Sequence, residues 1–289
     1  MSQPTPSPAG HDRIQLGVIG CGAAGIQNIR KLVEMAEKKE ENVTIPAVCD
    51  IYEPRKDRAK QLCGAKVFDD HRKLLEVKEL DAILIATPNH WHAQMMLDAL
   101  EAGKDVYCEE PMTLYLDEAK AVHRMAIRTQ RVVQIGSVAC SDERWERARE
   151  LIQAGKLGKV VWSQMSVACN SPQGVWNAPI EQEAYPGTPS SPGTLAWDRF
   201  LGSAPRRSFD PERYFRFRKF WDYSGGPATE LFPQALHALL KALGEEFPKR
   251  VAVAGGAFAL RDQEVPDTLQ MIADYPSEHS IVLAACLAN

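Results

Sequence analysis

The 289-residue sequence predicts an α/β protein built from two domains. From Ile14 to about Ile135, short apolar runs alternate with amphipathic stretches, which is typical of parallel strands joined by right-handed helical crossovers. After Gly136 the order changes, because three strand-like segments follow one another with no helix between them. That order favours an open, largely antiparallel sheet in an α+β domain. We therefore expect one domain over residues 14–138 and a second over residues 139–289.

The elements of the first domain follow from their apolar patterns. Continuous apolar runs such as residues 82–86 predict strands that are buried on both faces of a sheet. Apolar residues at every third or fourth position predict the helices between them. Pro46 interrupts one strand, which indicates a sheet edge or a bulge at that point. The expected strands cover residues 14–19, 43–49, 81–86, 105–108 and 131–135, and the expected helices cover residues 24–39, 53–62, 90–102 and 116–129.

The second domain begins with a helix over residues 142–154, which Gly155 ends. Residues 170–211 are rich in Pro, Gly and Ser and predict a long loop, a length that in compact domains usually serves function. The last strand runs almost to Asn289 with no closing element, so we expect an exposed apolar edge and a sheet that is incomplete at the C-terminus. The expected strands cover residues 159–168, 250–260, 268–275 and 280–287, and a further helix covers residues 231–243.

Composition and charge exclude several classes of protein. The 34 Lys and Arg residues against 38 Asp and Glu give a net charge of −4, which leaves no electrostatic footprint for nucleic acid. The sequence contains no run of 18 apolar residues, so it predicts no membrane span. Residues 1–13 lack the apolar core of a signal peptide, and we expect them to form a disordered leader. The seven cysteines lack C-x-x-C spacing, which predicts free thiols, no metal site and a cytoplasmic location.

A glycine-rich loop follows the first expected strand and opens the first expected helix. The first glycine permits a tight turn, the second lets a pyrophosphate approach the backbone, and the third lets helix and strand pack closely. The helix N-terminus then offers backbone N–H groups and the positive end of its dipole to phosphate oxygens. In this context the pattern G-x-G-x-x-G predicts a Rossmann dinucleotide-binding domain, whose loop consists of Gly20, Cys21, Gly22, Ala23, Ala24 and Gly25.

An acidic residue at the end of the second strand bears on the choice between the two nicotinamide dinucleotides. Asp50 stands 25 residues after Gly25, directly after the apolar run 47–49. Its carboxylate would accept hydrogen bonds from ribose hydroxyls and repel a 2′-phosphate, which favours NAD. Arg55 would instead pair with a 2′-phosphate, so NADP is the alternative. A different interpretation of Asp50 is a loop acid that caps the next helix.

Several segments together resemble the Gfo/Idh/MocA family, the relatives of glucose–fructose oxidoreductase and inositol dehydrogenase. The resemblance implies a Rossmann domain followed by a domain with a large open sheet, which often mediates oligomerisation, and hence a homo-oligomer. It also implies NAD(P)-dependent oxidation or reduction of a sugar, cyclitol or related hydroxyl compound. Members are commonly longer than 289 residues, in agreement with the unclosed last strand. The resemblance covers nearly the whole chain after residue 13 and rests on residues 17–22, 86–93, 102–112, 197–202, 209–211, 221–226 and 265–268.

The resemblance assigns a second loop to the ribose and nicotinamide side of the cofactor. This loop follows an expected strand, and doubly wound sheets bind ligands at the carboxyl ends of their strands. His90 and His92 lie two positions apart and face away from each other on a helix, which argues against a metal site; a structural role at the helix entry is the alternative for each. The cofactor-binding candidates of this loop are Thr87, Pro88, Asn89 and His92.

The Glu-Lys-Pro motif of the family is replaced here by Glu109, Glu110 and Pro111. In the family the lysine lies near the nicotinamide and the reacting hydroxyl. A lysine can stabilise a developing alkoxide, and a glutamate cannot supply that positive charge. We assign Glu109 and Pro111 to cofactor binding and Glu110 to the catalytic site.

The expected helix near residue 230 departs from the family as well. There the family carries an Asp and, four residues later, a His for general acid–base work, and these positions hold Glu230 and Gln234 here. On a helical wheel Glu230, Gln234 and His237 share one polar stripe. Glutamine cannot relay a proton as histidine does, and His237 stands one turn further on as a substitute. A solvated helix face is the alternative interpretation of the stripe.

Residues 214–221 alternate aromatic and basic side chains, a pattern that also occurs in sites for single-stranded nucleic acid. The acidity of the chain and the resemblance favour a strand or the wall of a small-molecule cleft instead, because aromatic faces and arginines bind sugar rings, hydroxyls and carboxylates.

The leading hypothesis is a cytoplasmic NAD(P)-dependent oxidoreductase that acts on a sugar-like alcohol, with no nucleic-acid or membrane partner. A base near Glu230 or His237 would take the hydroxyl proton, and Glu110 and Gln234 would position the substrate. Two alternatives are a cofactor-binding family member without turnover and an NAD-dependent glycoside hydrolase.

Overall fold

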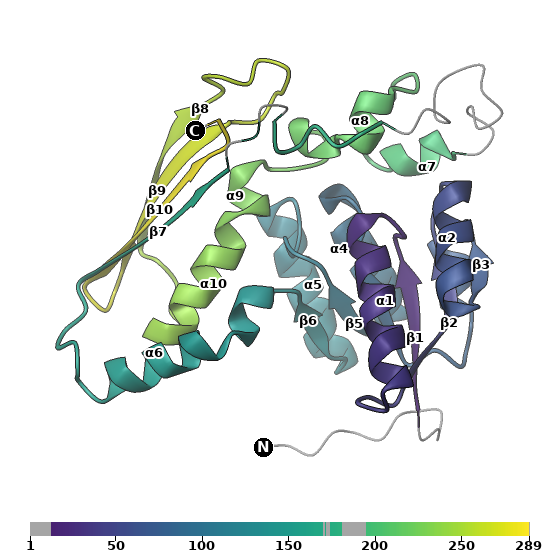
Figure 1. Cartoon of the computed structure of the whole chain (residues 1–289), viewed down its shortest axis with the longest axis horizontal. Helices are drawn as coiled ribbons and strands as arrows, with labels where there is room; N and C mark the ends of the chain where they lie inside the picture. Colours follow the sequence, from purple (N-terminus) through teal and green to yellow (C-terminus); the bar gives the residue numbers. More distant parts are fainter. Residues whose placement is uncertain (1–12, 170, 172–173, 181–194, 289) are drawn as a thin grey trace. The chain divides into compact units, whose positions relative to one another are not determined.

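The computed structural model describes residues 13–169, 171, 174–180 and 195–288 (Figure 1). The expected disordered leader lies outside the described residues, apart from Arg13. The chain divides into two compact units. Unit 1 comprises Met1–Gly136 and Glu181–Pro211, and unit 2 comprises Ser137–Ile180 and Glu212–Asn289.

Unit 1 is built on a parallel sheet of six strands in the order β3-β2-β1-β4-β5-β6. The chain passes through β1, β2 and β3 to one edge and returns to β4 on the other side of β1, so the strand order reverses beside β1. In open α/β sheets this reversal forms a crevice at the carboxyl ends of the strands, where ligands bind. The strands are β1 (Ile14–Ile19), β2 (Val43–Cys49), β3 (Lys66–Phe68), β4 (Ala82–Ile85), β5 (Asp105–Cys108) and β6 (Val133–Ile135).

Helices cover both faces of this sheet (Figure 1). On one face Ile29 and Ala59, from two different helices, pack with Val18 and Val48 of the strands. On the other face, the core contains Met96 and further apolar residues of the fourth and fifth helices. The helices are α1 (Ala23–Glu37), α2 (Glu53–Cys63), α3 (His71–Leu75), α4 (Asn89–Glu101) and α5 (Leu116–Thr129).

The expected strands and long helices of this unit are confirmed, with end shifts of one or two residues. The structure adds β3 and α3, which the sequence did not predict because three and five residues are too short to show a hydrophobic period. Pro46 lies in β2 at a bulge, since the pairing of β1 with β2 shifts register between Gln15 and Gly17.

Residues 195–211 belong to unit 1, although they fall in the region expected as a long loop. They form a short helix, α7 (Trp197–Leu201), which is anchored by its backbone. The carbonyl oxygen of Phe200 lies 2.8 Å from Nε1 of Trp91, which donates to it, and 2.7 Å from Nε2 of His90. Trp197 stacks on Phe200, so an aromatic cluster holds this segment against α4.

Unit 2 contains a sheet of four strands in the order β7-β10-β9-β8 (Figure 1). The pairs β8–β9 and β9–β10 are antiparallel, which confirms the expected largely antiparallel sheet. The third pair, β10–β7, is parallel, so the sheet is mixed. Phe232 and Leu239 of α10 pack against Ile281 and Leu283 of the sheet. The elements are η1 (Val138–Ser141), α6 (Glu143–Gln153), β7 (Trp162–Ala168), α8 (Pro211–Phe215), η3 (Phe217–Lys219), α9 (Pro227–Glu230), α10 (Phe232–Leu243), β8 (Arg250–Gly256), β9 (Thr268–Tyr275) and β10 (His279–Cys286).

The expectation that the last strand forms an exposed edge is wrong. β10 lies inside the sheet, paired on one side with β9 and on the other with β7 along its length. The partner β7 comes more than 100 residues earlier in the chain, and such a distant pairing leaves no trace in the local sequence pattern. The edges of this sheet are β7 and β8 instead.

The single polar stripe expected over residues 230–243 is also wrong, because two helices occupy the region. α9 ends at Glu230, Leu231 lies between the two helices with φ −119°, and α10 begins at Phe232. Pro233 explains the break, since a proline cannot continue a preceding helix and fits in the first turn of a new one. Residues 214–221 contain the end of α8 and the 3₁₀ turn η3, so the expectation of a strand is wrong, while the alternative of a cleft wall stays a prediction.

Two further observations concern the chain as a whole. All seven cysteines are free. Among the described residues, no helix has the length and apolar character that a membrane crossing requires.

Candidate functional site

The glycine-rich loop connects β1 to α1 at the reversal of strand order in unit 1. Gly20 has a φ of +92°, and a Cβ atom there would lie 2.4 Å from the carbonyl oxygen of Ala86. A Cβ atom at Gly25 would lie 1.8 Å from the carbonyl oxygen of Gly20. Both positions therefore require glycine for the loop to fold.

Gly22 differs from its two neighbours in the motif. A Cβ atom there would approach only the guanidinium of Arg55, with Nη1 at 3.4 Å. No side chain caps the N-terminus of α1, which has no acidic residue in its first turn, and Ala23 and Ala24 are exposed. The backbone N–H groups of this turn have no partner within the helix and form an anion site. The absence of a side chain at Gly22 leaves room for a phosphate beside them.

Asp50 is buried at the end of β2 and its carboxylate faces the glycine loop. Oδ2 accepts a hydrogen bond from the backbone N–H of Cys21 at 2.7 Å, and Oδ1 accepts one from the N–H of Tyr52 at 2.9 Å. These bonds fix the carboxylate, and each oxygen keeps a lone pair for a ribose hydroxyl. The alternative of a helix-capping acid does not describe this geometry, because no side chain caps the N-terminus of α2.

His92 ties together the two loops that follow β4 and β5. It is 1% exposed, and its Nδ1 lies 2.7 Å from the carbonyl oxygen of Pro111 while its Nε2 lies 2.8 Å from that of Thr87. Both ring nitrogens lie within hydrogen-bond distance of backbone carbonyl oxygens, so the ring holds the two loops together. The structure thus brings the second loop and the Glu-Glu-Pro segment side by side.

Asn89 is 2% exposed, and its side-chain oxygen has no hydrogen-bond partner among the described residues. A buried acceptor without a partner costs free energy unless a ligand supplies a donor. Asn89 follows Pro88 at the carboxyl end of β4, where a ribose hydroxyl or a carboxamide N–H of a dinucleotide would be such a donor. Together with the glycine loop and Asp50, this position shows that unit 1 fits a nicotinamide dinucleotide.

Glu109 is fixed by the first helix, since its Oε1 accepts a hydrogen bond from Nδ2 of Asn28 at 2.5 Å. A Cβ atom at Gly136 would lie 2.7 Å from Oε2 of Glu109, so that glycine makes space for the carboxylate. Glu110 is half-buried beside it. Burial raises the pKa of the Tyr107 hydroxyl, and the charges of Glu109 and Glu110 raise it further, so the end of β5 is a negatively charged environment.

Glu230 is buried in unit 2, and both of its carboxylate oxygens have partners. Oε2 accepts a hydrogen bond from Nε of Arg218, and Oε1 accepts one from the hydroxyl of Ser224 at 3.1 Å. The Ser224 hydroxyl in turn accepts the backbone N–H of Gly226 at 3.1 Å. A solvated helix face is therefore the wrong interpretation for Glu230, although Gln234 on α10 is exposed.

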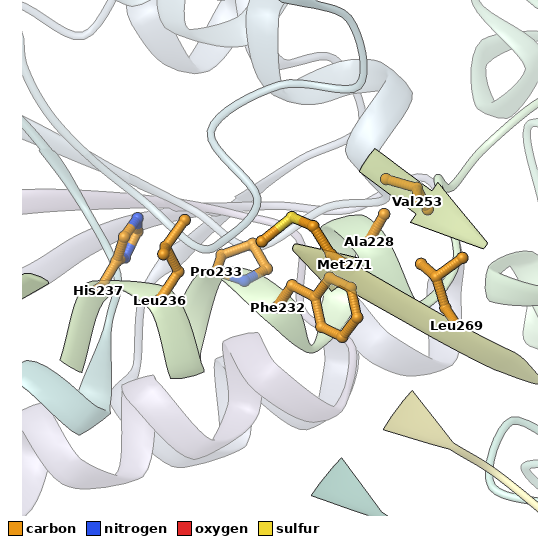
Figure 2. A pocket seen from close by; sticks show the side chains of 8 residues that line it. All are labelled: Ala228, Phe232, Pro233, Leu236, His237, Val253, Leu269 and Met271. Carbon is orange, nitrogen blue, oxygen red and sulfur yellow. The ribbon is translucent and has the colours of Figure 1, made fainter. Parts of the chain in front are cut away.

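His237 lies at one end of an apolar pocket of about 210 Å³ in unit 2 (Figure 2). Its Nδ1 lies 3.1 Å from the hydroxyl oxygen of Ser137, which lies 3.4 Å from the sulfur of Cys140. One turn further along α10, Lys241 donates to the carbonyl oxygen of Cys140 at 2.7 Å. Apart from His237, the pocket is lined by Ala228, Phe232, Pro233, Leu236, Val253, Leu269 and Met271.

The predicted site residues fall into two groups. All the predicted cofactor residues and Glu110 belong to unit 1, whereas Glu230, Gln234 and His237 belong to unit 2. Four polar residues that contact them were missed by the sequence analysis. Asn28 carries a usable signal, since it stands three residues after Gly25 on α1. The other three are Ser137, Arg218 and Ser224; Ser137 contacts a residue 100 positions away, and Arg218 and Ser224 lie in the turns that precede α9.

The sheet order, the glycine loop and the acid at the end of β2 define a dinucleotide-binding protein of the Rossmann type. Residues 14–137 match the model of the GFO_IDH_MocA family, which is described as an oxidoreductase family with an NAD-binding Rossmann fold. Over this domain, the chain is similar to the Gfo/Idh/MocA oxidoreductase family.

Similar proteins of known sequence include two cyclitol dehydrogenases. The chain is 30% identical over 157 residues to a scyllo-inositol 2-dehydrogenase (NAD(+)) of Bacillus subtilis, a stretch that covers 52% of this chain and 43% of the relative. It is 31% identical over 146 residues to inositol 2-dehydrogenase 3 of Saccharopolyspora erythraea, covering 50% of this chain and 42% of the relative. The chain thus matches less than half the length of these curated relatives.

Solved structures resemble nearly the whole chain. The WlbA dehydrogenase from Bordetella pertussis, in complex with NADH and UDP-GlcNAcA, has a TM-score of 0.74 at 17% identity and covers 96% of this chain and 72% of that one. An NAD-binding protein from Listeria innocua has a TM-score of 0.71 at 21% identity and covers 96% and 68%. At these identities the similarity establishes the fold, which includes the sheet of unit 2.

Proposed function

We propose that this chain is an NAD-dependent oxidoreductase that transfers a hydride between the nicotinamide cofactor and a carbinol carbon of a sugar, cyclitol or related hydroxyl compound, in the cytoplasm. The observation that carries the proposal is the glycine loop of unit 1 with the buried Asp50 bonded to the N–H of Cys21. Bound NAD would supply the nicotinamide ring that accepts the hydride. The match of residues 14–137 to an oxidoreductase family and the similarity to inositol dehydrogenases support the reaction class and the substrate class.

NAD is favoured over NADP by the carboxylate of Asp50. The carboxylate is held by two backbone N–H groups beside the loop, where it would accept ribose hydroxyls and repel a 2′-phosphate. The counterargument is Arg55, whose guanidinium lies near Gly22 and would attract a phosphate.

His237 is the better candidate for the general base of unit 2. Both carboxylate oxygens of Glu230 are already engaged, one by Arg218 and the other by Ser224. His237 is held by the Ser137 hydroxyl at Nδ1, and an imidazole can accept a proton near neutral pH. We assign substrate-positioning roles to Gln234 in unit 2 and to Glu110 in unit 1.

The test is formation of NADH from NAD with a panel of sugars and cyclitols. We expect turnover by the wild-type chain and a loss of about 100-fold or more in kcat for His237→Asn, the usual effect of removing a general base. Ser137→Ala should shift the pH dependence of kcat, because the hydroxyl sets which ring nitrogen carries the proton. NADH formation that is unchanged in His237→Asn would remove that assignment.

A cofactor-binding protein without turnover is the second candidate. It is favoured by one observation, the glutamate at position 110 where the resemblance implies a lysine. NAD binding without NADH formation over the whole panel would support it.

We also infer that the chain forms homo-oligomers through the sheet of unit 2. Side chains alternate along a strand, so the face opposite α10 carries a row formed by Ala252, Ile272 and Val282, which pair across β8, β9 and β10. Ile272 is 48% exposed there. An apolar row on an uncovered sheet face suits a second copy of the same surface.

A further inference from the structure

We propose that Arg218 is a substrate-binding residue that recognises a carboxylate, so that the hydroxyl compound of the proposed function is an acidic sugar. The inference rests on that function and names its substrate class. It starts from the environment of Glu230, the residue that stands at the expected catalytic position.

Glu230 anchors Arg218 from the buried side. The Glu230 side chain is 7% exposed and holds Nε of Arg218, while the Ser224 hydroxyl occupies its other oxygen. The sequence explains this contact, because glutamate is one carbon longer than the aspartate that the resemblance implies and reaches further. A carboxylate that is bound on both oxygens acts as a support for the guanidinium.

Arg218 presents the rest of its guanidinium to the outside. Its side chain is 43% exposed, and the guanidinium carbon lies 4.6 Å from the centre of the Phe217 ring. In the described part of the chain, neither of its terminal Nη groups makes a hydrogen bond. The carboxylate of Glu230 and the ring of Phe217 thus fix the plane of the Arg218 guanidinium, while its terminal N–H groups can donate to a ligand.

Arg213 and Lys219, which lie near Arg218 in the sequence, already bond to side chains of the protein. Nη1 of Arg213 donates to Asp222 at 2.9 Å and its Nη2 donates to Glu264 at 2.8 Å. Lys219 is 3% exposed and donates to Asp262 at 2.6 Å and to Asn177 at 2.8 Å.

A fixed guanidinium with free terminal nitrogens is suited to a planar anion. Two parallel N–H···O bonds to a carboxylate match the fork geometry of arginine, and a sugar hydroxyl offers only one neutral acceptor. Glu230 balances the charge of Arg218 in the free protein, so the preference comes from these paired bonds more than from net charge. A hexuronic acid would meet the requirement and a neutral hexose would not.

The experiment compares D-glucuronate with D-glucose, which differ in the carboxylate at C6. Each is titrated calorimetrically into the full chain, with and without saturating NAD. We expect D-glucuronate to bind about tenfold more tightly or better, the usual effect of charged hydrogen bonds. Arg218→Gln should abolish the preference and Arg218→Lys should retain part of it. Arg261→Gln is the matched control, since it removes the same charge from an exposed arginine of unit 2 and should leave the preference intact.

Arg218→Gln leaves Glu230 buried without its partner and could unfold unit 2. The double variant Arg218→Gln/Glu230→Gln removes both charges and is expected to show the same loss of preference. Equal affinities in the wild type, failure of both sugars to bind, or a preference that survives in the folded double variant would overturn the proposal. NAD titrations on the same samples report on the proposed function separately, because they involve unit 1 and need no sugar.

Discussion

Gly22 and Gly25 belong to the same loop for different physical reasons, and substitution separates these reasons. At Gly25 a Cβ atom meets backbone at 1.8 Å, so the residue serves the fold. At Gly22 a Cβ atom meets only the flexible end of Arg55 at 3.4 Å, so the fold does not require glycine there, and we propose that the residue leaves space for the ligand. Single residues in this site therefore divide into those that build the loop and those that leave it accessible.

Gly22→Val should abolish NAD binding while unit 1 stays folded, because the branched side chain fills the space beside the N-terminus of α1. Calorimetric titration with NAD and circular dichroism measure the two effects. Gly25→Ala is the contrasting variant and should destabilise the protein by about 3 kcal/mol or more through its backbone clash. Unchanged NAD affinity in folded Gly22→Val would contradict the assignment of the phosphate site.

Glu110 and Gln234 occupy the positions where the resemblance implies a lysine and a histidine. If these replacements slow the enzyme, Glu110→Lys should raise NADH formation about tenfold by stabilising a developing alkoxide. Adding Gln234→His should raise it by more than the two single changes predict, because groups that act on one reaction are not additive. The wild type, both singles and the double are assayed over one sugar and cyclitol panel. A fast wild type that Glu110→Lys inactivates would show that Glu110 itself is catalytic.

At the scale of elements, β10 shows how a strand's place in a sheet determines the properties of its residues. The strand lies between β7 and β9, and its alternate residues His279, Ile281, Leu283 and Ala285 are buried. His279 is the polar member of that row, with Nε2 at 3.0 Å from the hydroxyl oxygen of Ser163 on β7. A histidine in this position couples the stability of the sheet to pH.

Burial lowers the pKa of His279 below its usual value near 6.5, although the charge of Glu246 opposes the shift. The folded state then keeps the ring neutral while the unfolded chain binds a proton as the pH falls through 6.5, so acid reduces stability. Urea unfolding at about pH 7.5 and about pH 5.5 measures the difference. His279→Gln should reduce that difference, and an identical pH dependence in the variant would exclude His279 as its source.

At the scale of the whole molecule, we propose that the face of the unit 2 sheet opposite α10 mediates assembly. Ile272→Asp places a charge in the middle of the apolar row that pairs Ala252, Ile272 and Val282. We expect the wild type to be an oligomer by light scattering and the variant to be a monomer with an unchanged fold, since Ile272 is 48% exposed in the single chain. Gln164→Asp, on β7 of the same face, tests whether the contact reaches the edge strand. A monomeric wild type would rule out this surface as an interface.

The dinucleotide-binding part of the protein could be predicted from the sequence because its determinants are local. Residues 20–25 and Asp50 belong to one β-α-β segment, and the strand and helix periods around them are read within short windows. The same holds for the long helices of unit 1.

Tertiary structure alone decided the environment of the catalytic candidates. The break between α9 and α10 removed Glu230 from the stripe of His237, and the fold then joined Glu230 to Arg218 and His237 to Ser137. It also placed β10 inside its sheet, through pairing with a strand more than 100 residues away. A sequence pattern records the period of one element, whereas these contacts depend on which distant elements meet, and that is determined by the packing of the folded chain.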